Sequence, residues 1–183
     1  GGLIEAWGEQ LARDADSSVF VLKFGGTGGR AERSTCHPLD FWDRNDGEVW
    51  AVNLPGYGCS SGRASLQRMA AAGMAAYHAA VRAAAGRPLL ITGNSLGTTI
   101  ALYVAAAVHV DGLILRNPPP LRELIVGRYG QWNLGLGAKL IAAQVPSELN
   151  SILNAQLCTA PCVWMTSGQD RVVPPEYQQM VID

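Results

Sequence analysis

Charge is scarce in this sequence, and neither sign is in excess. Of 183 residues, 14 are Lys or Arg and 15 are Asp or Glu, so only 16% are charged and the formal net charge is −1. A nucleic-acid-binding surface needs an excess of basic side chains, which this chain lacks. Because 48% of the residues are apolar, the composition predicts one folded domain that does not bind nucleic acid.

Long apolar runs are also lacking. The longest strongly apolar stretch, Ile100 to Val110, contains His109 and is about half of the roughly 20 residues that a membrane-spanning helix needs. No basic and then apolar leader opens the chain, which favours a cytoplasmic protein. The first residue is Gly1 rather than Met, so the missing leader says little about location.

Cysteine is the third scarce component. The four cysteines, Cys36, Cys59, Cys158 and Cys162, are too few and too irregularly spaced for a disulfide framework. Cys158 and Cys162 have no histidine near them and lack the spacing of a zinc site. We therefore expect reduced thiols and no bound metal. No feature of the sequence indicates an oligomeric state.

Short apolar runs bounded by turn residues predict five buried strands. They are Val19–Phe24, Val49–Asn53, Leu89–Thr92, Gly112–Leu115 and Cys162–Thr166. Helical patterns lie between them, most clearly in Leu66–Ala85 behind the N-cap candidate Ser65 and in Thr98–Ala107. This alternation predicts an α/β fold, with a mostly parallel sheet and helices on both faces.

Two segments have less regular patterns. The first residues, with Leu3, Ile4 and Trp7, fit a short strand or the first turns of a helix, and we favour an edge strand. Residues 118–160 predict a small helical cap inserted into a single domain, 1–183. Its expected helical pieces are Leu121–Val126, Leu134–Gln144 and Ser147–Gln156. The cap is rich in apolar residues, and we expect Trp132 to line a ligand pocket.

The strongest chemical feature is the run Gly93-Asn94-Ser95-Leu96-Gly97, between a strand pattern and a helix pattern. This is the setting of a nucleophile elbow. Small residues two positions on either side let the serine side chain project, and the backbone N–H of Leu96 points to where an oxyanion forms. The simpler alternative is a glycine-rich turn in which Ser95 only caps the helix.

A glycine-rich loop follows the first confident strand. Gly26, Gly28 and Ala31 fit the spacing of the dinucleotide-binding fingerprint, which makes a dinucleotide-binding enzyme one alternative. However, the run from Arg30 to Pro38 is polar and ends in proline where that fingerprint needs an apolar-faced helix. Asn53 stands where a ribose-binding acid is expected, and no Lys has P-loop spacing. An oxyanion loop explains the glycines better.

An acidic residue follows the last predicted strand. Asp170 lies in the segment Gly168–Pro174. In an acyl-transfer triad, a carboxylate at a strand end holds a histidine in the useful tautomer and stabilises its cation. The chain order of serine and then acid is that of the α/β hydrolases. The alternative is an aspartate that only caps the helix after Pro174.

Four motifs in this order resemble an α/β-hydrolase-fold serine hydrolase, of the branch with serine aminopeptidases and small esterases. They are the glycine-rich loop, the run Leu-Pro-Gly-Tyr-Gly-Cys-Ser-Ser-Gly at 54–62, the Ser95 elbow and the Asp170 segment. The resemblance covers about Val19 to the end. It implies that a small-molecule ester, thioester or amide is cleaved through an acyl-serine intermediate, without metal or organic cofactor.

The resemblance also implies a role for each matching residue. Ser95 is the expected nucleophile and Asp170 orients a histidine, while the backbone N–H groups of Leu96 and Thr27 bind the oxyanion. Gly26 is expected at the substrate pocket. The sequence departs from the family at Gly26 and its predecessor, where His-Gly is common, and at Asn53, where Asp is common.

A third departure concerns the catalytic histidine, which in this family follows the acid. No histidine follows Asp170. His78 and His109 are expected to be structural, and His37 is the only one that we place near the pocket. Because the sequence ends at Asp183, inside an expected helix, we expect the C-terminal part with the histidine to be missing. The contrasting hypothesis is a catalytically inactive binding module with this fold.

Overall fold

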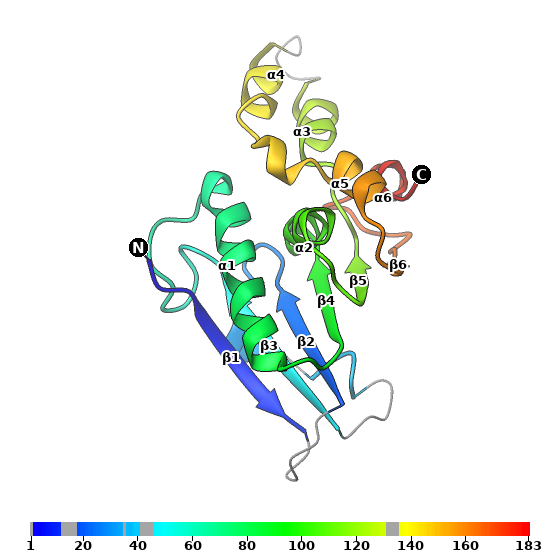
Figure 1. Ribbon diagram of the computed structural model, residues 1–183. Coiled ribbons are helices and arrows are strands. Elements are labelled where there is room, and N and C mark those ends of the chain that lie inside the picture. The colour runs from blue at the N-terminus through cyan, green and yellow to red at the C-terminus, as the bar shows by residue number, and fades with distance from the viewer. Residues whose placement is uncertain (1, 12–17, 35, 41–45, 131–135) are drawn as a thin grey trace.

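The computed structural model describes residues 2–11, 18–34, 36–40, 46–130 and 136–183 (Figure 1). Six strands form one sheet in the order β1-β3-β2-β4-β5-β6. The strands are β1 (Glu5–Gln10), β2 (Val19–Phe24), β3 (Gly47–Asn53), β4 (Leu89–Asn94), β5 (Gly112–Arg116) and β6 (Cys162–Met165). All neighbouring pairs are parallel except β1 and β3. The predicted mostly parallel sheet, its five strands and the N-terminal edge strand are therefore confirmed.

The helices match the sequence pattern except at their ends. They are α1 (Leu66–Ala84), α2 (Leu96–Ala107), α3 (Leu121–Tyr129), α4 (Leu136–Ala142), α5 (Ser151–Leu157) and α6 (Pro175–Ile182), with 3₁₀ helices η1 (Ala31–Arg33) and η2 (Ser147–Leu149). Ser65 is the N-cap residue of α1, but its side chain caps no backbone N–H and its hydroxyl instead donates to Gln67 Oε1 at 2.6 Å.

Helices α1 and α2 cover the same face of the sheet. Their alanines and glycines permit close packing: a Cβ on Gly73 of α1 would collide with Ile100 of α2. The core beneath them includes Phe20, Leu22 and Ile91, which are fully buried. This packing fixes α2, and with it the turn that precedes α2, against the centre of the sheet.

The opposite face of the sheet has a smaller apolar cluster. Val21 and Val49 are buried there against Leu39, which lies in the segment between β2 and β3. In the described part of the chain, this face carries the short helix η1 and the turn at 37–40 rather than long helices. The fold class is as predicted, but α1 and α2 lie on one face only.

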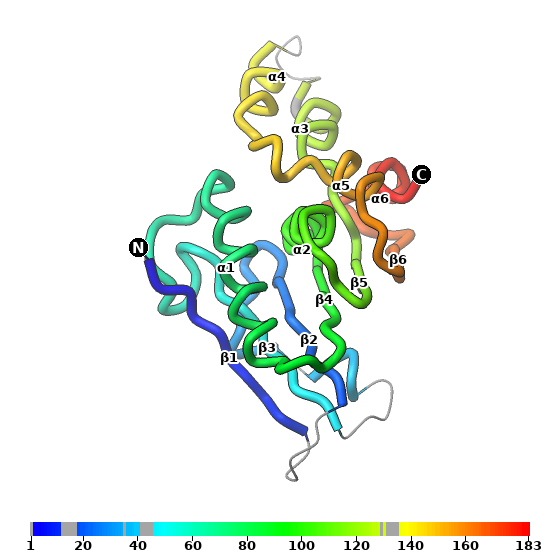
Figure 2. Tube along the Cα trace, in the orientation of Figure 1, coloured from blue at the N-terminus to red at the C-terminus, as the bar shows by residue number. Residues whose placement is uncertain are grey.

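Helices α3 and α4, in the segment predicted to form a cap, lie beyond the carboxyl ends of β2 and β4 (Figure 1). Helix α3 packs against α4, whereas α5 packs against α2 and α6. The glycine-rich loop after β2 passes beside the start of α2 (Figure 2). Trp132 lies outside the described residues. None of the helices in the described ranges is long and apolar enough to cross a membrane.

Candidate active site

The carboxyl ends of three neighbouring strands are joined by backbone hydrogen bonds. The N–H of Ser95, just after β4, donates to the carbonyl oxygen of Arg116 at the end of β5, at 2.8 Å. The N–H of Asn117, just after β5, donates to the carbonyl oxygen of Met165 at the end of β6, at 2.8 Å. Residues that follow β4, β5 and β6 therefore meet at one edge of the sheet, where parallel α/β sheets build their sites.

Ser95 occupies a sharp turn between β4 and α2. Its backbone angles, φ 50° and ψ −121°, are rare for a residue with a side chain and indicate local strain. A Cβ on Gly93 would lie 2.7 Å from Thr98 Cα, and one on Gly97 would collide with the carbonyl oxygen of Phe24. The turn therefore requires glycine on both sides of Ser95, as a nucleophile elbow does.

The glycine-rich loop lies against this turn. A Cβ on Gly26 would lie 3.2 Å from Ser95 Cβ and 3.1 Å from the carbonyl oxygen of Asn94. The N–H of Gly29 donates to the carbonyl oxygen of Gly26 at 2.9 Å, which closes the loop into a tight turn. Gly26 and Leu96 also line one small cavity of about 10 Å³. Thus the loop and the first amide of α2, which has no acceptor within its helix, lie on the same side of Ser95.

The structure brings together three of the predicted site residues: Ser95, Leu96 and Gly26. Thr27 is exposed in the same loop, and the role of its N–H as an oxyanion donor stays a prediction. Trp132 is not among the described residues, so its place at the pocket also stays a prediction.

Asp170 is half-buried and accepts hydrogen bonds on both oxygens. Its Oδ2 accepts from Asn117 Nδ2 at 2.8 Å, and its Oδ1 accepts from the N–H groups of Val172 at 2.7 Å and Val173 at 3.0 Å. The predicted strand-end acid is therefore held rigidly, and its Asn117 contact ties it to the end of β5.

Two residues that support Asp170 escaped the sequence analysis. Asn117 follows β5 with φ 52°, and its buried Oδ1 has no hydrogen-bond partner among the described residues. Gln178 of α6 is fully buried, and its Nε2 donates to the Val173 carbonyl oxygen at 2.6 Å, while its Oε1 accepts from Ser167 N–H at 3.3 Å. Gln178 thus connects the two ends of the loop that carries Asp170, at Ser167 and Val173. The only signal for Asn117 was its place directly after a strand.

The cap is attached to the same loop. Arg128 of α3 donates through Nη1 to the carbonyl oxygens of Arg171 at 2.7 Å and Val172 at 3.0 Å. A Cβ on Gly127 would collide with the Tyr177 hydroxyl of α6. The cap helix α3 therefore contacts the segment that orients Asp170.

Within the described ranges, which include all three histidines, none hydrogen-bonds to Asp170. His78 is exposed on α1. His109 precedes β5, at the opposite end of the sheet from Ser95, and its Nε2 lies 3.6 Å from Asp111 Oδ1. His37 lies on the face of the sheet that α1 and α2 leave uncovered.

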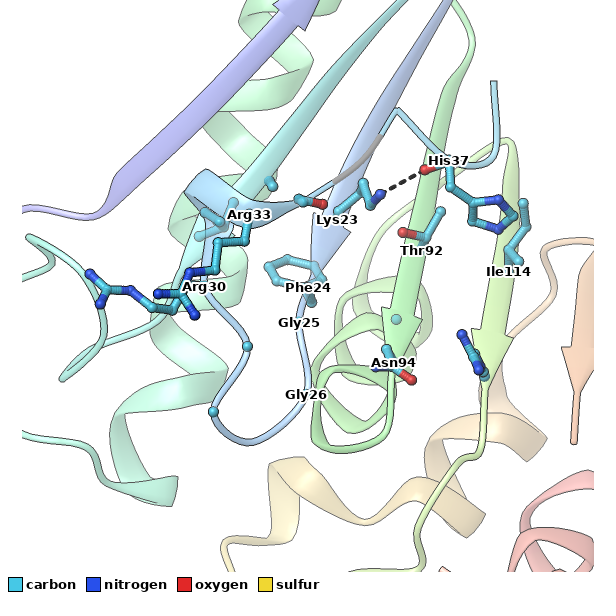
Figure 3. A pocket seen from close by; sticks show the side chains of 18 of the residues that line it. Lys23, Phe24, Gly25, Gly26, Arg30, Arg33, His37, Thr92, Asn94 and Ile114 are labelled. Carbon is cyan, nitrogen blue, oxygen red and sulfur yellow. Dashed lines mark hydrogen bonds between the residues drawn. The ribbon is translucent and has the colours of Figure 1, made fainter. Parts of the chain in front are cut away.

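A larger cavity of about 460 Å³ lies on that face (Figure 3). Gly26, Asn94 and His37 contribute to its wall, and Lys23 Nζ donates to the His37 carbonyl oxygen at 2.8 Å. Neither Ser95 nor Asp170 lines it. The cavity therefore adjoins the glycine-rich loop but is separate from the candidate catalytic groups.

Two of the four thiols, those of Cys36 and Cys162, are poor candidates for the nucleophile. Burial raises the pKa of Cys162 to about 12, with the neighbouring Cys158 adding to the shift, and burial is also the main cause that raises the pKa of Cys36 to about 11. Both thiols are therefore protonated at neutral pH. The described residues hold no group of three or more His, Cys, Asp or Glu that could bind a metal ion.

The dinucleotide alternative finds no support in the loop geometry. A pyrophosphate site needs the N-terminus of a helix directly after the glycines. Here the glycines lead into η1, a 3₁₀ helix of three residues, Ala31–Arg33. The loop instead lies against Ser95 through Gly26.

Comparison with known proteins gives one family and many similar folds. The sequence model described as alpha/beta hydrolase fold matches residues 39–157. Among solved structures, Est1E from Butyrivibrio proteoclasticus with bound ferulic acid is 17% identical with a TM-score of 0.68, over 96% of this chain and 79% of that one. Acetyl xylan esterase from Paenibacillus sp. R4 is 15% identical with a TM-score of 0.76, over 99% and 69%.

A soluble variant of monoglyceride lipase from Saccharomyces cerevisiae, in complex with a substrate analog, is 15% identical. Its TM-score is 0.69, and the similarity covers 100% of this chain and 79% of that one. No curated protein sequence matches the chain. At these identities, the structures establish a shared fold.

Proposed function

Because the chain belongs to the alpha/beta hydrolase fold family and is a hydrolase, we propose that it is a serine hydrolase. Its substrate is a small-molecule ester, thioester or amide, and the reaction passes through an acyl-serine intermediate. The observation that carries the proposal is the conformation of Ser95, a strained turn residue between Gly93 and Gly97 with Gly26 beside it. An ordinary helix-capping serine does not need this strain.

In the proposed reaction, Ser95 Oγ attacks the carbonyl carbon of the substrate and transfers its proton to a histidine base. The carbonyl oxygen becomes an oxyanion, which the N–H groups of Leu96 and Thr27 stabilise; each such donor is worth roughly 3 to 4 kcal/mol. The tetrahedral intermediate then expels the alcohol, thiol or amine, which takes the proton from the histidine. Water attacks the acyl-serine by the same steps and releases the acid.

Asp170 has the proposed role of orienting the histidine and stabilising its cation. The hydrogen bonds from Asn117 and from the amides of Val172 and Val173 support this role, because they fix both carboxylate oxygens. We assign the base to none of the three histidines of this sequence. The proposal therefore requires a histidine from outside these 183 residues.

A fluorophosphonate probe tests the nucleophile in the natural full-length protein. We expect one labelled site, and we expect Ser95→Ala to abolish labelling. Ser147→Ala is the matched control, because Ser147 is an exposed serine of η2 whose hydroxyl donates to Glu148 Oε2 and to no other described residue. Labelling that survives Ser95→Ala would refute the assignment.

The second candidate is a binding module that has the fold but no turnover. The observation that favours it is the set of partners of Asp170, which among the described residues includes no histidine. The same probe separates the two candidates. A full-length protein in which Ser95 stays unreactive would support the binding module.

A further inference from the structure

Asn53 is a buried polar residue at the end of β3, next to the glycine-rich loop. Its exposed fraction is 1%, and each polar atom of its side chain has partners. Its Oδ1 accepts from the N–H of Ala31 at 2.9 Å. Its Nδ2 donates to Glu5 Oε2 at 2.7 Å and to Glu32 Oε2 at 3.1 Å.

The two glutamates reach Asn53 from different segments. Glu5 belongs to β1 and also accepts from the N–H of Cys59 at 2.7 Å, while Glu32 belongs to η1 and pairs with Arg30 at 2.5 Å. The hydrogen bonds lower the pKa of both carboxyl groups, for Glu5 chiefly the one from Cys59 N–H and then the one from Asn53. Two ionised carboxylates therefore face one amide group.

The turn that follows β3 lies close against the Asn53 side chain. A Cβ on Gly58 would collide with both Asn53 Nδ2 and the Glu5 carboxylate, so the turn after β3 closes over the amide. Ser60 Oγ donates to the Asn53 carbonyl oxygen at 2.5 Å and accepts from Glu5 N–H at 2.8 Å. Asn53 thus joins β1, β3, η1 and the turn at 57–60.

The Ala31 contact connects this network to Ser95. Ala31 is two residues beyond Gly29, whose N–H closes the loop turn on the Gly26 carbonyl oxygen. Gly26 lies against Ser95. The anchored end of the loop is therefore only five residues from the part that touches the serine.

We propose that Asn53 is a positioning residue that holds the glycine-rich loop against Ser95. It must be an amide, because only a group that donates two hydrogens and accepts one satisfies Glu5, Glu32 and the Ala31 N–H together. The effect on chemistry rests on the proposed function, whereas the loop anchoring does not.

Asn53→Asp is the decisive change, since it alters the charge and donors but hardly the shape. The new carboxyl would face Glu5 from β1 and Glu32 from η1, with Arg30 as the nearby cation. Burial and two carboxylates raise its pKa in the folded protein above its unfolded value of about 4. At low pH the folded variant therefore tolerates the protonated, neutral acid. As the pH rises from about 4 through the raised pKa of the folded state, the variant loses stability.

The first measurement is thermal unfolding at pH 5 and pH 8. We expect Asn53→Asp to lower Tm by about 5 to 10 °C at pH 8 and by much less at pH 5. Adding Glu5→Gln to Asn53→Asp should recover part of the loss, because the amide and carboxylate then exchange places. A loss of equal size at both pH values, without recovery, would overturn the charge argument.

The second measurement is hydrogen–deuterium exchange of the peptide 25–33 at pH 8, at a temperature where every variant is folded. Asn53→Asp should accelerate this exchange. Asn154→Asp should not, although Asn154 of α5 is also buried and donates to the Glu148 carbonyl oxygen at 2.7 Å, because it has no hydrogen bond to the glycine-rich loop in the described structure. Unchanged exchange in Asn53→Asp would overturn the anchoring role, whether or not the protein is a serine hydrolase.

The third measurement is the rate at which the fluorophosphonate labels Ser95 in the full-length protein. We expect a loss of about tenfold or more for Asn53→Asp, since losing one oxyanion donor costs on the order of 10² to 10³. Asn154→Asp should label at the unaltered rate. If Asn53→Asp exchanges faster but is labelled at the normal rate, Asn53 does not act on Ser95. If the protein without substitutions is not labelled at all, the proposed function is refuted, and the exchange measurement alone then tests the anchoring role of Asn53.

Discussion

Ser95 and Asp170 are held in different ways, and the difference bears on what each can do. Ser95 is held by backbone geometry, since its φ of 50° persists only because Gly93 and Gly97 leave space and its N–H is bonded to Arg116. Asp170 is held by three hydrogen bonds to its carboxylate. These hydrogen bonds fix the orientation of the carboxylate, which is what its proposed role toward a histidine requires.

Replacing Asp170 with Asn tests this role. We expect ester hydrolysis by the full-length protein to fall by about 10³ to 10⁴-fold, because an amide favours the wrong histidine tautomer. The measurement is kcat with a chromogenic ester. Asp111→Asn is the control, since Asp111 accepts from Leu89 N–H at 2.7 Å at the far end of the sheet. A loss below tenfold for Asp170→Asn would leave Asp170 only a structural cap.

Sequence alone indicated these two residues but not their supports. Ser95 and Asp170 stand in short motifs whose chemistry depends on neighbours in the chain. Asn117 meets Asp170 across 53 positions, and Gln178 acts through a loop 11 positions away. Such contacts depend on which strands are neighbours, and no local pattern contains that information.

At the scale of elements, the turn at Ser95 depends on how β4, α2 and the end of β2 pack together. Gly97 is the first-turn residue of α2 that lets the helix approach Phe24 and the following loop. Helix α2 is in turn fixed by α1, whose Gly73 faces Ile100. The serine turn is therefore one consequence of how closely two helices and a strand pack.

Gly97→Ala should consequently lower stability. Its Cβ would collide with backbone atoms, which cannot move away as a flexible side chain can. We expect a loss of about 1 to 3 kcal/mol or more in the free energy of unfolding, measured with urea. Gly168→Ala is the matched control, because a Cβ there meets nothing within 4 Å. Equal effects of the two changes would contradict a steric requirement at Gly97.

The sequence predicted the elements better than their arrangement. The strand runs were recognisable because buried parallel strands are continuously apolar, and β4 was predicted to within two residues of its observed end, Asn94. The uneven cover of the two sheet faces was not predicted. Among the described residues between β2 and β3, the structure has the three-residue 3₁₀ helix Ala31–Arg33 and turns, so no long helix from these residues covers the second face.

At the scale of the whole molecule, the edge of the sheet that carries the candidate active site is built from parts distant in sequence. The loop after β2, the elbow after β4 and the Asp170 segment after β6 lie at one end of the sheet, and α3 and α4 lie beyond that end (Figure 1). Arg128 links α3 to the Asp170 segment. The predicted cap is thus connected to the candidate active-site edge by hydrogen bonds as well as by the chain.

The cap also presents apolar surface that the described core does not use. Leu136 and Leu140 of α4 are each 70% exposed, and Ile141 is 56% exposed. Exposing large apolar side chains together is unfavourable unless something covers them. We expect the cap, including Trp132, to favour a modest apolar acyl or alkyl group on the substrate.

Trp132→Ala in the full-length protein should therefore change selectivity and not only rate. Across acetate, butyrate and octanoate esters, relative kcat/KM should shift by about 1 to 3 kcal/mol, the usual range for an apolar pocket. Leu3→Ala is the control, because Leu3 is 77% exposed at the other end of the chain and should leave the ratios unchanged. If Trp132→Ala alters all three esters by one common factor while the protein stays folded, then the cap does not select the apolar group.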